Sequence, residues 1–256
     1  SGRGSIVRYR PEMGEAANVE LEVELALRLA LEQSRIALVL QPRLSLDDLH
    51  CHGAEALVRL RGTDGSLQLP DTFIGVAERC GLMPRLGEHV LGLACAALRQ
   101  IRDVRPDFSV SINLSPLELR DASLPARLEA ALRASNLPPD CLELELTESA
   151  LIEDPRLAAH RLAELKACGL RIALDDFGVG FSGLSHLLEF PIDVLKIDRS
   201  FVSRMLSDAT ANALVEGLIT LARRLGLRVV AEGVEDEACL SRLRSLGCEE
   251  AQGYSI

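Results

Sequence analysis

Short apolar runs alternate with longer helical stretches through most of the chain. Each run ends near a polar residue and precedes a stretch of helical composition, which is typical of alternating strands and helices. The runs are ALVLQP (37–42), GAEALVRL (53–60), FSVSINLSP (108–116), CLELELTES (141–149), RIALDD (171–176), DVLKID (193–198), RVVAEG (228–233) and EAQGYSI (250–256). Eight runs predict an α/β fold, a (β/α)8 TIM-like barrel. An open doubly wound sheet is the alternative, but no glycine-rich phosphate loop follows the first run.

Two segments near the N-terminus depart from this alternation. The first two runs are joined by about ten residues containing LDDLHCH, too few for a crossover helix, so we expect an antiparallel hairpin and one reversed strand in the barrel. Residues 19–33 alternate apolar and polar positions, yet they consist mainly of strong helix formers and predict a helix. Residues 1–20 are predicted to lie outside the fold, since SGRG resembles an expression remnant and RYRPEMGEAAN a linker.

Strand parity predicts which side chains face the barrel axis, because successive side chains point to opposite faces. With the polar residue near the end of each run pointing inward, the inward set is Glu55, Asn113, Glu145, Asp175, Lys196, Glu232 and Gln252. The same parity includes Leu57, Arg59, Ser109, Ser111, Ala173, Asp198 and Val230, whereas the opposite parity is mostly apolar, as in Val110, Ile112, Ile172, Leu174 and Val229. The acids are therefore expected at the rim where such barrels place their chemistry.

The predicted rim offers an all-oxygen ligand set of carboxylates and one amide, which suits Mg²⁺ or Mn²⁺. Asp175 is expected to point inward and Asp176 to lie where the chain turns away, so the pair would hold two ions or two sides of one ion. Glycines 178, 180 and 183 predict a mobile loop beside the site. Lys196 either forms a salt bridge with Asp198 or orients an attacking hydroxide or a phosphate.

Simpler interpretations apply to several of these residues. One acid at a strand end is usually a helix cap or a solvated residue, but seven polar residues in phase on separate strands favour a site. Glu143 faces inward lower in the barrel and is interpreted as a paired structural acid. The HCH segment, His50 to His52, is interpreted as surface, because a His pair without a third ligand does not make a metal site.

Composition bounds the classes of protein. The 256 residues, 48% hydrophobic and 26% charged, fit one large domain, and no membrane span or signal peptide is evident, which predicts a cytoplasmic domain. Seven scattered cysteines without a CxxC pair indicate reduced thiols and no zinc. A net charge of -10 argues against a nucleic-acid duplex or an anionic membrane as partner, and an anionic small ligand would need local cations.

The chain resembles the EAL-type cyclic di-GMP phosphodiesterases over most of residues 20–256. The matching motifs occur in order: QP, EALVRL, NLSP, ELTES, ALDDFGVGFSGLSHL, LKIDRSFV, VVAEGVE, and GC through QGY. The resemblance implies a barrel that spans residues 21–256 and contains one antiparallel strand. It also implies hydrolysis of cyclic di-GMP to the linear dinucleotide pGpG with one or two Mg²⁺ or Mn²⁺ ions.

The resemblance also assigns roles by motif. Glu55, Asn113, Glu145 and Asp175 would hold the first metal, and Asp175, Asp176 and Glu232 would hold a second. Lys196 would steer the attacking water, with Glu232 as general base. Glu148 would anchor the glycine loop, and Glu235 and Asp198 would support the metal ligands. The nucleotide contacts would be Gln41, Leu57, Arg59 and Gln252, with Asp198 close to them.

The chain departs from the family pattern in its loop, where Val179, Phe181 and Gly183 replace the usual Thr, Tyr and Ser, and at Leu60, where an aromatic residue is common. The metal-site positions remain, so loop control and dimer contacts are in doubt before catalysis. The chain stops after QGY, before the closing helix that the resemblance implies. We further expect a fragment of a longer sensor protein with an upstream GGDEF domain, and a homodimer with contacts near the glycine loop.

Two other functions remain open at the level of sequence. A receptor that binds cyclic di-GMP without cleaving it is the main alternative, although such relatives typically lose acids from the motifs and this chain keeps them. A barrel that acts on another phosphorylated metabolite requires the motif match to be ignored. An assay for pGpG with cyclic di-GMP and Mn²⁺ separates the three.

Overall fold

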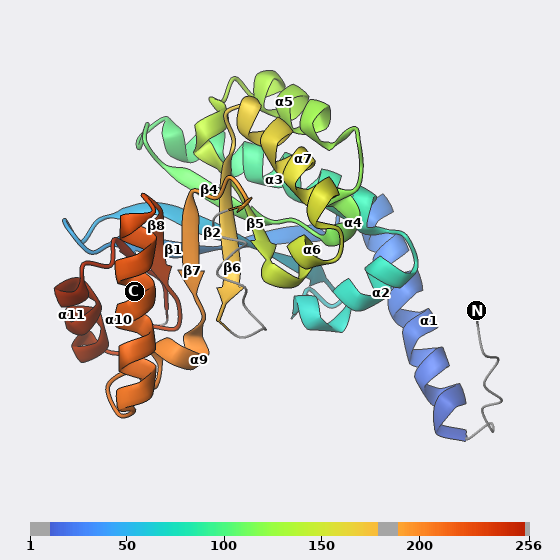
Figure 1. Ribbon diagram of the computed structural model, residues 1–256. Helices are drawn as coiled ribbons and strands as arrows, with labels where there is room; N and C mark the ends of the chain where they lie inside the picture. Colours follow the sequence, from blue (N-terminus) through green and yellow to red (C-terminus); the bar gives the residue numbers. More distant parts are fainter. Residues whose placement is uncertain (1–10, 179–188, 254–256) are drawn as a thin grey trace.

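The computed structural model describes residues 11–178 and 189–253 (Figure 1). The strands are β1 Ile36–Ser45, β2 Cys51–Arg61, β3 Leu67–Gln68, β4 Ser109–Asn113, β5 Leu142–Thr147, β6 Arg171–Phe177, β7 Val194–Ile197, β8 Arg228–Ala231 and β9 Glu250–Ala251. The α-helices are α1 Pro11–Glu32, α2 Ile74–Arg79, α3 Met83–Arg102, α4 Pro116–Leu119, α5 Leu124–Ala134, α6 Glu148–Ile152, α7 Pro155–Ala167, α9 Arg199–Val202, α10 Ala209–Arg224 and α11 Glu237–Leu246. Two 3₁₀ turns are η1 Pro70–Thr72 and η2 Pro139–Cys141.

Eight strands close into a barrel in the order β1-β9-β8-β7-β6-β5-β4-β2, and β1 pairs with β2 to complete the ring. Strand β1 runs antiparallel to both of its neighbours, β2 and β9. The other neighbouring pairs of the ring are parallel: β2–β4, β4–β5, β5–β6, β6–β7, β7–β8 and β8–β9. Strand β3 lies outside the ring, paired with β2. The predicted barrel with one reversed strand is confirmed, and each strand of the ring overlaps one of the eight predicted runs, the last of them over Glu250–Ala251 alone.

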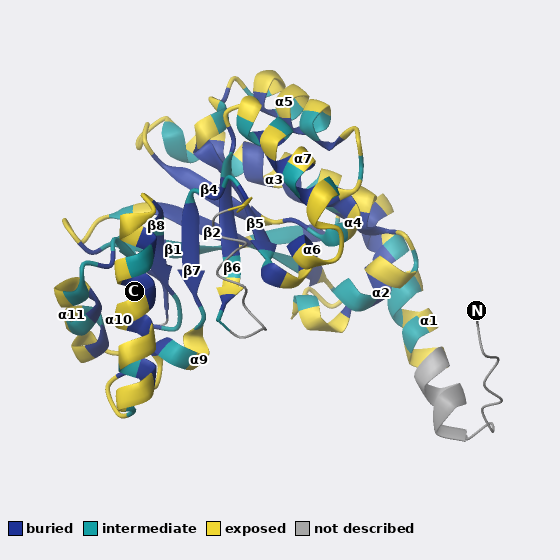
Figure 2. Cartoon of the chain, in the orientation of Figure 1, coloured by how far each residue is buried: buried dark blue, intermediate teal, exposed yellow. Residues whose placement is uncertain are grey.

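Helices cover the outer face of the sheet. The outward side chains of Ile172, Leu174 and Val229 are fully buried, and Figure 2 shows dark blue strands beneath helices whose outer sides are yellow. In α3 the buried residues recur three or four positions apart, which puts them on one face: Met83, Leu86, Val90, Leu91, Ala94, Cys95 and Leu98. The apolar parity of the strands therefore serves the helix layer, as predicted, and leaves the other parity for the barrel interior.

Helix α1 is longer than predicted. The helix expected over 19–33 begins at Pro11, so residues 11–18 continue it instead of lying outside the regular structure. Proline suits the first turn of a helix, where its missing N–H costs no hydrogen bond, and Glu and Ala are good helix formers. The assignment of this segment as a connection between domains stays a prediction.

A layer of ion pairs fills the barrel below the rim. Arg43 is 1% exposed, donates from Nη1 to Glu143 Oε1, and places Nε 3.6 Å from Glu250 Oε2. Arg228 completes the layer, 3.1 Å from Glu143 Oε2 and 2.8 Å from Glu250 Oε1. Gly53 makes room for the Arg43 side chain, because a Cβ at position 53 would lie 2.9 Å from Arg43 Nη2. Glu143 is thus the paired structural acid that the sequence predicts.

The variant Arg43→Met is expected to lower the free energy of unfolding by about 3–5 kcal/mol, because it removes one cationic partner from a buried carboxylate. The double variant Arg43→Met/Glu143→Leu should regain much of that loss, since a packed apolar pair carries no desolvation cost. Urea unfolding measures both changes. A double variant less stable than the single variant would contradict the expectation.

Helix α4 begins with a buried capping box. Ser115 Oγ accepts from the Glu118 N–H at 3.2 Å, and the Ser115 N–H donates to Glu118 Oε2 at 3.2 Å. Glu118 is 5% exposed, and burial raises the pKa of its carboxyl. A Cβ at Gly87 of α3 would lie 1.8 Å from Glu118 Oε1, so a larger residue there would displace the Glu118 carboxyl from the capping box.

The raised pKa of Glu118 predicts that the effect of replacing this residue on stability depends on pH. Between its ordinary pKa and the raised folded value, the native state holds more protons than the unfolded state, so the stability contribution falls as pH rises through that window. Glu118→Gln keeps an acceptor for Ser115 without a charge, and should raise the melting temperature by ~2 °C at neutral to alkaline pH but not in acid. Melting curves at both pH values test this, with the exposed Glu88→Gln as the control.

Candidate metal centre and active site

Lys196 of β7 lies at the centre of the predicted acid cluster. Its side chain is 1% exposed, because the strand directs it into the barrel interior at the carboxyl end of the sheet. The ammonium contacts four carboxylates contributed by four other segments. The distances from Nζ are 2.7 Å to Glu145 Oε2, 2.7 Å to Glu232 Oε1, 3.1 Å to Asp175 Oδ1 and 3.3 Å to Glu55 Oε2. The structure therefore brings together the inward residues of β2, β5, β6 and β7 and the residue that follows β8.

Amide side chains orient one of these acids. Asn113 Nδ2 donates to Glu55 Oε1 at 2.9 Å, and Gln252 Nε2 donates to Glu55 Oε2 at 2.8 Å. Gln252 also donates to Gln41 Oε1 at 3.0 Å. Residues from β1, β2 and β4 and the segment after β9 thus meet around one carboxylate, and both Glu55 oxygens are held in fixed directions.

A β-bulge explains the two adjacent acids of DDFG. The pairing of β6 with β7 runs from Leu174↔Leu195 to Phe177↔Ile197, so β6 carries one extra residue. Asp176 has a φ of 53°, in the left-handed region that Asp tolerates better than most residues. Its N–H donates to Asp175 Oδ1 at 3.0 Å. The bulge lets Asp175, Asp176 and Glu232 bring carboxylate oxygens within 4.8 Å of one another, which alternating strand residues would not do.

The charges of the cluster are unbalanced. Burial raises the pKa of Glu145 to about 8 and that of Glu232 to about 7, against the opposing effect of Lys196. Burial raises the pKa of Asp176 as well, with the Asp175 charge adding to it. Burial alone would lower the pKa of Lys196, but the surrounding carboxylates raise it well above its ordinary value. One ammonium faces four close carboxylates, so a further cation would be stabilised there.

The donor set fits a divalent cation. Among the described residues, Glu145 Oε1 is buried and has no hydrogen-bond partner, an arrangement that costs free energy unless a ligand takes that oxygen. Asp175, Asp176 and Glu232 form a cluster with metal-ligand spacing. Hard cations such as Mg²⁺ and Mn²⁺ prefer carboxylate oxygens. The residues that could hold one or two such ions are Glu55, Asn113, Glu145, Asp175, Asp176 and Glu232.

Four further predicted site residues lie on β2 and on the segments that follow β5, β7 and β8. Asp198 caps α9 by accepting from the Ser200 N–H at 2.9 Å, and its charge helps raise the pKa of Asp176. Arg59 Nη1 donates to the Val58 carbonyl at 2.9 Å. Glu148 is buried in the first turn of α6, and Glu235 lies between β8 and α11. The glycine loop that Glu148 is predicted to anchor, with Val179, Phe181 and Gly183, lies outside the described residues.

A cavity of about 520 Å³ adjoins the cluster at the carboxyl end of the barrel. Its walls come from β2, η1, α2, α3 and the β4–α4 connection, and they include Leu57, Pro70, Asp71, Glu78 and Asn113. Sequence reasoning found Leu57 and Asn113 by parity but missed Asp71 and Glu78, because these residues lie on short helical turns that carry no strand parity. Arg43 was also missed, although it shares the inward parity of Gln41.

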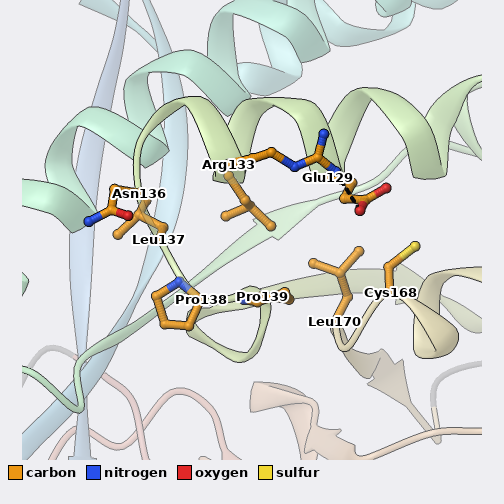
Figure 3. Close-up of a pocket in the computed structure, with 9 residues that line it drawn as sticks. Glu129, Arg133, Asn136, Leu137, Pro138, Pro139, Cys168 and Leu170 are labelled. Atoms are coloured by element: carbon orange, nitrogen blue, oxygen red, sulfur yellow. Dashed lines mark hydrogen bonds and ion pairs between the residues drawn. The ribbon is translucent and has the colours of Figure 1, made fainter.

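A second cavity of about 500 Å³ lies away from the acids (Figure 3). It is formed where α5 and α7 end, with Leu132, Leu137 and Leu170 as its apolar floor and the Arg133–Glu129 ion pair at 2.5 Å on its rim. None of the acids that surround Lys196 lines it. We therefore place the chemistry at the acid cluster and its adjoining cavity.

Among the residues that the structure describes, the cluster with metal-ligand spacing contains no histidine or cysteine. His52 Nε2 lies 2.8 Å from Asp48 Oδ2 and Cys51 Sγ donates to the Gly53 carbonyl, so these two side chains of the HCH segment have local partners. All seven cysteines lie in the described part of the chain and are free thiols. None of the helices described here combines the length and the apolar character that a membrane span requires.

Comparison with known proteins agrees with this geometry. A family model described as the EAL domain matches residues 24–256. The chain is 36% identical to the bifunctional diguanylate cyclase/cyclic di-GMP phosphodiesterase MucR of Pseudomonas aeruginosa, over 100% of this chain and 37% of that protein. It is 37% identical to the cyclic di-GMP phosphodiesterase NbdA of the same species, over 99% of this chain and 32% of that protein. The chain thus spans about a third of these relatives.

Solved structures give the same assignment. The phosphodiesterase PaMucR in its c-di-GMP complex superposes with a TM-score of 0.86 at 37% identity, covering 91% of this chain and 95% of that one. The FimX EAL domain from Pseudomonas aeruginosa bound to c-di-GMP gives a TM-score of 0.84 at 26% identity, covering 91% and 93%. The family resemblance read from the motifs is confirmed: this chain belongs to the EAL domain family.

Proposed function

We propose that the chain is a phosphodiesterase that hydrolyses cyclic di-GMP to linear pGpG with Mg²⁺ or Mn²⁺ at the rim of its barrel. The observation that carries the proposal is the bulged Asp175–Asp176 pair, which faces Glu232 beside a buried lysine. The relatives MucR and NbdA are named as cyclic di-GMP phosphodiesterases. This chain keeps the acids at all the metal-site positions of the family motifs, which favours an enzyme over a receptor.

Two charged residues of the cluster have direct roles in this reaction. A bound divalent cation would polarise the phosphoryl oxygens and lower the pKa of the attacking water. Lys196, held 2.7 Å from both Glu145 and Glu232, directs an ammonium N–H toward the nucleophile or a phosphoryl oxygen. Burial raises the pKa of the Glu232 carboxyl, which makes its carboxylate a better acceptor for the proton of the water.

The adjoining cavity is the natural place for a guanine base. Leu57 and Pro70 offer apolar contact, and the carboxylates of Asp71 and Glu78 lie on its wall. Guanine presents N1–H and amino donors, which a carboxylate can accept. Gln41, Arg59, Gln252 and Asp198 would contact the rest of the nucleotide. Glu148 and Glu235 would support the loop and the metal ligands.

Purified protein incubated with cyclic di-GMP and Mn²⁺, followed by chromatography, tests the proposal directly. We expect pGpG to accumulate, to disappear when a chelator is added, and to return when Mn²⁺ or Mg²⁺ is restored. Nucleotide binding without pGpG would instead assign the chain as a receptor. Absence of both binding and product would overturn both assignments.

The proposal extends to the longer protein. Because the chain spans about a third of its curated relatives and one of them is named a bifunctional diguanylate cyclase, we expect a GGDEF domain upstream. Seven free thiols fit a reducing compartment such as the cytoplasm. The dimer contact near the glycine loop stays a prediction, since it rests on residues outside the described ranges.

A further inference from the structure

Helix α1 has two apolar faces. From Val19 to Leu31 every second residue is apolar, and in an α-helix two steps turn the chain by about 200°, so this alternation fills two opposite faces. One face packs on the barrel: Leu27 and Ala30 are 0% exposed and Leu31 is 3% exposed. The strand-like alternation of this segment therefore arises from a helix with two apolar faces, of which the second can serve as a contact surface.

The second face is an open leucine stripe, defined here as Leu21, Leu25 and Leu29. These side chains are 53%, 53% and 48% exposed, and their spacing of four residues aligns them along one side of the helix. Single exposed leucines are ordinary, but an aligned set marks an interaction surface. In Figure 1 the helix runs out to one side of the barrel, where a partner can reach it.

We propose that the leucine stripe is an interface with a second copy of this chain, in which the two α1 helices pack antiparallel with Leu25 on the two-fold axis. In this register Leu21 faces the partner's Leu29, so the stripe is self-complementary, as a two-fold interface requires. The flank that carries Arg28 faces the same flank of the partner and sets Arg28 near the partner's Glu24. Within one copy Arg28 already bonds Glu24 at 2.8 Å, so four charges would alternate across the axis.

Charge argues against the other arrangements. A parallel pair would place Glu32 opposite the partner's Glu32 and Glu22 near the partner's Glu24, which juxtaposes like charges. An anionic membrane is disfavoured by the glutamates beside the stripe and by the net charge of -10. Three leucines in each copy cover less than the ~800 Å² of a standard partner surface, so we expect weak association, with a dissociation constant on the order of 100 μM.

Sedimentation of the whole chain over a range of concentrations tests the interface. The weight-average mass of the wild type should rise toward that of a dimer, and Leu25→Glu should raise the dissociation constant by at least ~10-fold, because it buries two like charges at the axis. Leu206→Glu, at an exposed leucine far along the chain (51% exposed), is the matched control and should behave as the wild type. A wild type that stays monomeric, or a concentration dependence of the mass that Leu25→Glu leaves unchanged, would overturn the proposal, whereas a Leu25→Glu dimer smaller than the wild-type assembly would support it and report the separate contact near the glycine loop.

Disulfide trapping tests the register. Under mild oxidation Leu25→Cys should cross-link to itself, whereas Leu21→Cys and Leu29→Cys should cross-link only when the two variants are mixed. The wild type, with its seven thiols, gives the background. Equal self-linking of Leu21→Cys and Leu25→Cys would contradict the antiparallel arrangement. These readouts need no nucleotide and no turnover, so they are independent of the proposed function.

Discussion

The variant Asp175→Asn is expected to bind divalent cations more weakly and to lose nearly all hydrolysis of cyclic di-GMP. Asparagine keeps the shape of the side chain and an oxygen that can still accept the Asp176 N–H, now bonded at 3.0 Å, so the bulge should persist. What disappears is one negative charge beside Asp176 and Glu232. We expect Mn²⁺ affinity to fall by at least ~10-fold and turnover by about 10³-fold, since the activation of water depends on the cation.

Calorimetric titration with Mn²⁺ and a chromatographic assay for pGpG measure the two effects. Asp208→Asn is the matched control, because Asp208 caps α10, is not among the four carboxylates that contact Lys196, and Asn caps helices equally well. Both proteins are also melted without metal. A melting temperature of Asp175→Asn at or above that of the wild type would show that the fold is intact, since the variant removes one of several mutually repelling charges. Near wild-type turnover in Asp175→Asn would show that DDFG is not a metal site here.

Strand parity predicted much of the site because parity is a local property that survives folding. Glu55, Glu145 and Lys196 each sit within a strand, so the side of the sheet that each faces follows from its position alone. Closure of eight such strands then brings inward residues to a common axis, whatever the connecting helices do. The contacts of Lys196 with four acids follow from that geometry.

Features that depend on pairing between distant strands could not be predicted this way. The bulge in β6 is a property of its register with β7, and the left-handed Asp176 exists only in that context. The partnership of Arg43 with Glu143 joins residues 100 positions apart, although its inward parity was visible. The cavity beside the acids has a wall at Asp71 and Glu78 that comes from the turn η1 and the helix α2, which carry no strand parity. The start of α1 was missed because the segment from Pro11 looks polar, and polarity alone does not distinguish a linker from a helix.

Lys196→Met is expected to separate catalysis from cation binding. Methionine fills most of the buried volume but removes the ammonium that lies 2.7 Å from Glu145 and from Glu232. The acids then lack their internal cation, so Mn²⁺ affinity should be kept or increased. Turnover should still fall by about 10²-fold or more, because the nucleophile and the phosphoryl oxygens lose an oriented donor.

The variant Lys196→Arg shows whether charge alone is sufficient. A guanidinium keeps the positive charge but presents a planar fork in place of a compact ammonium, so it should keep the fold without metal and still turn over slowly. Melting curves with and without Mn²⁺ verify that Lys196→Met is folded in the loaded state, where the cation replaces the missing charge. If Lys196→Met hydrolyses cyclic di-GMP within about twofold of the wild type, the lysine is a salt-bridge residue that balances the acids, and Glu232 must position the water without it.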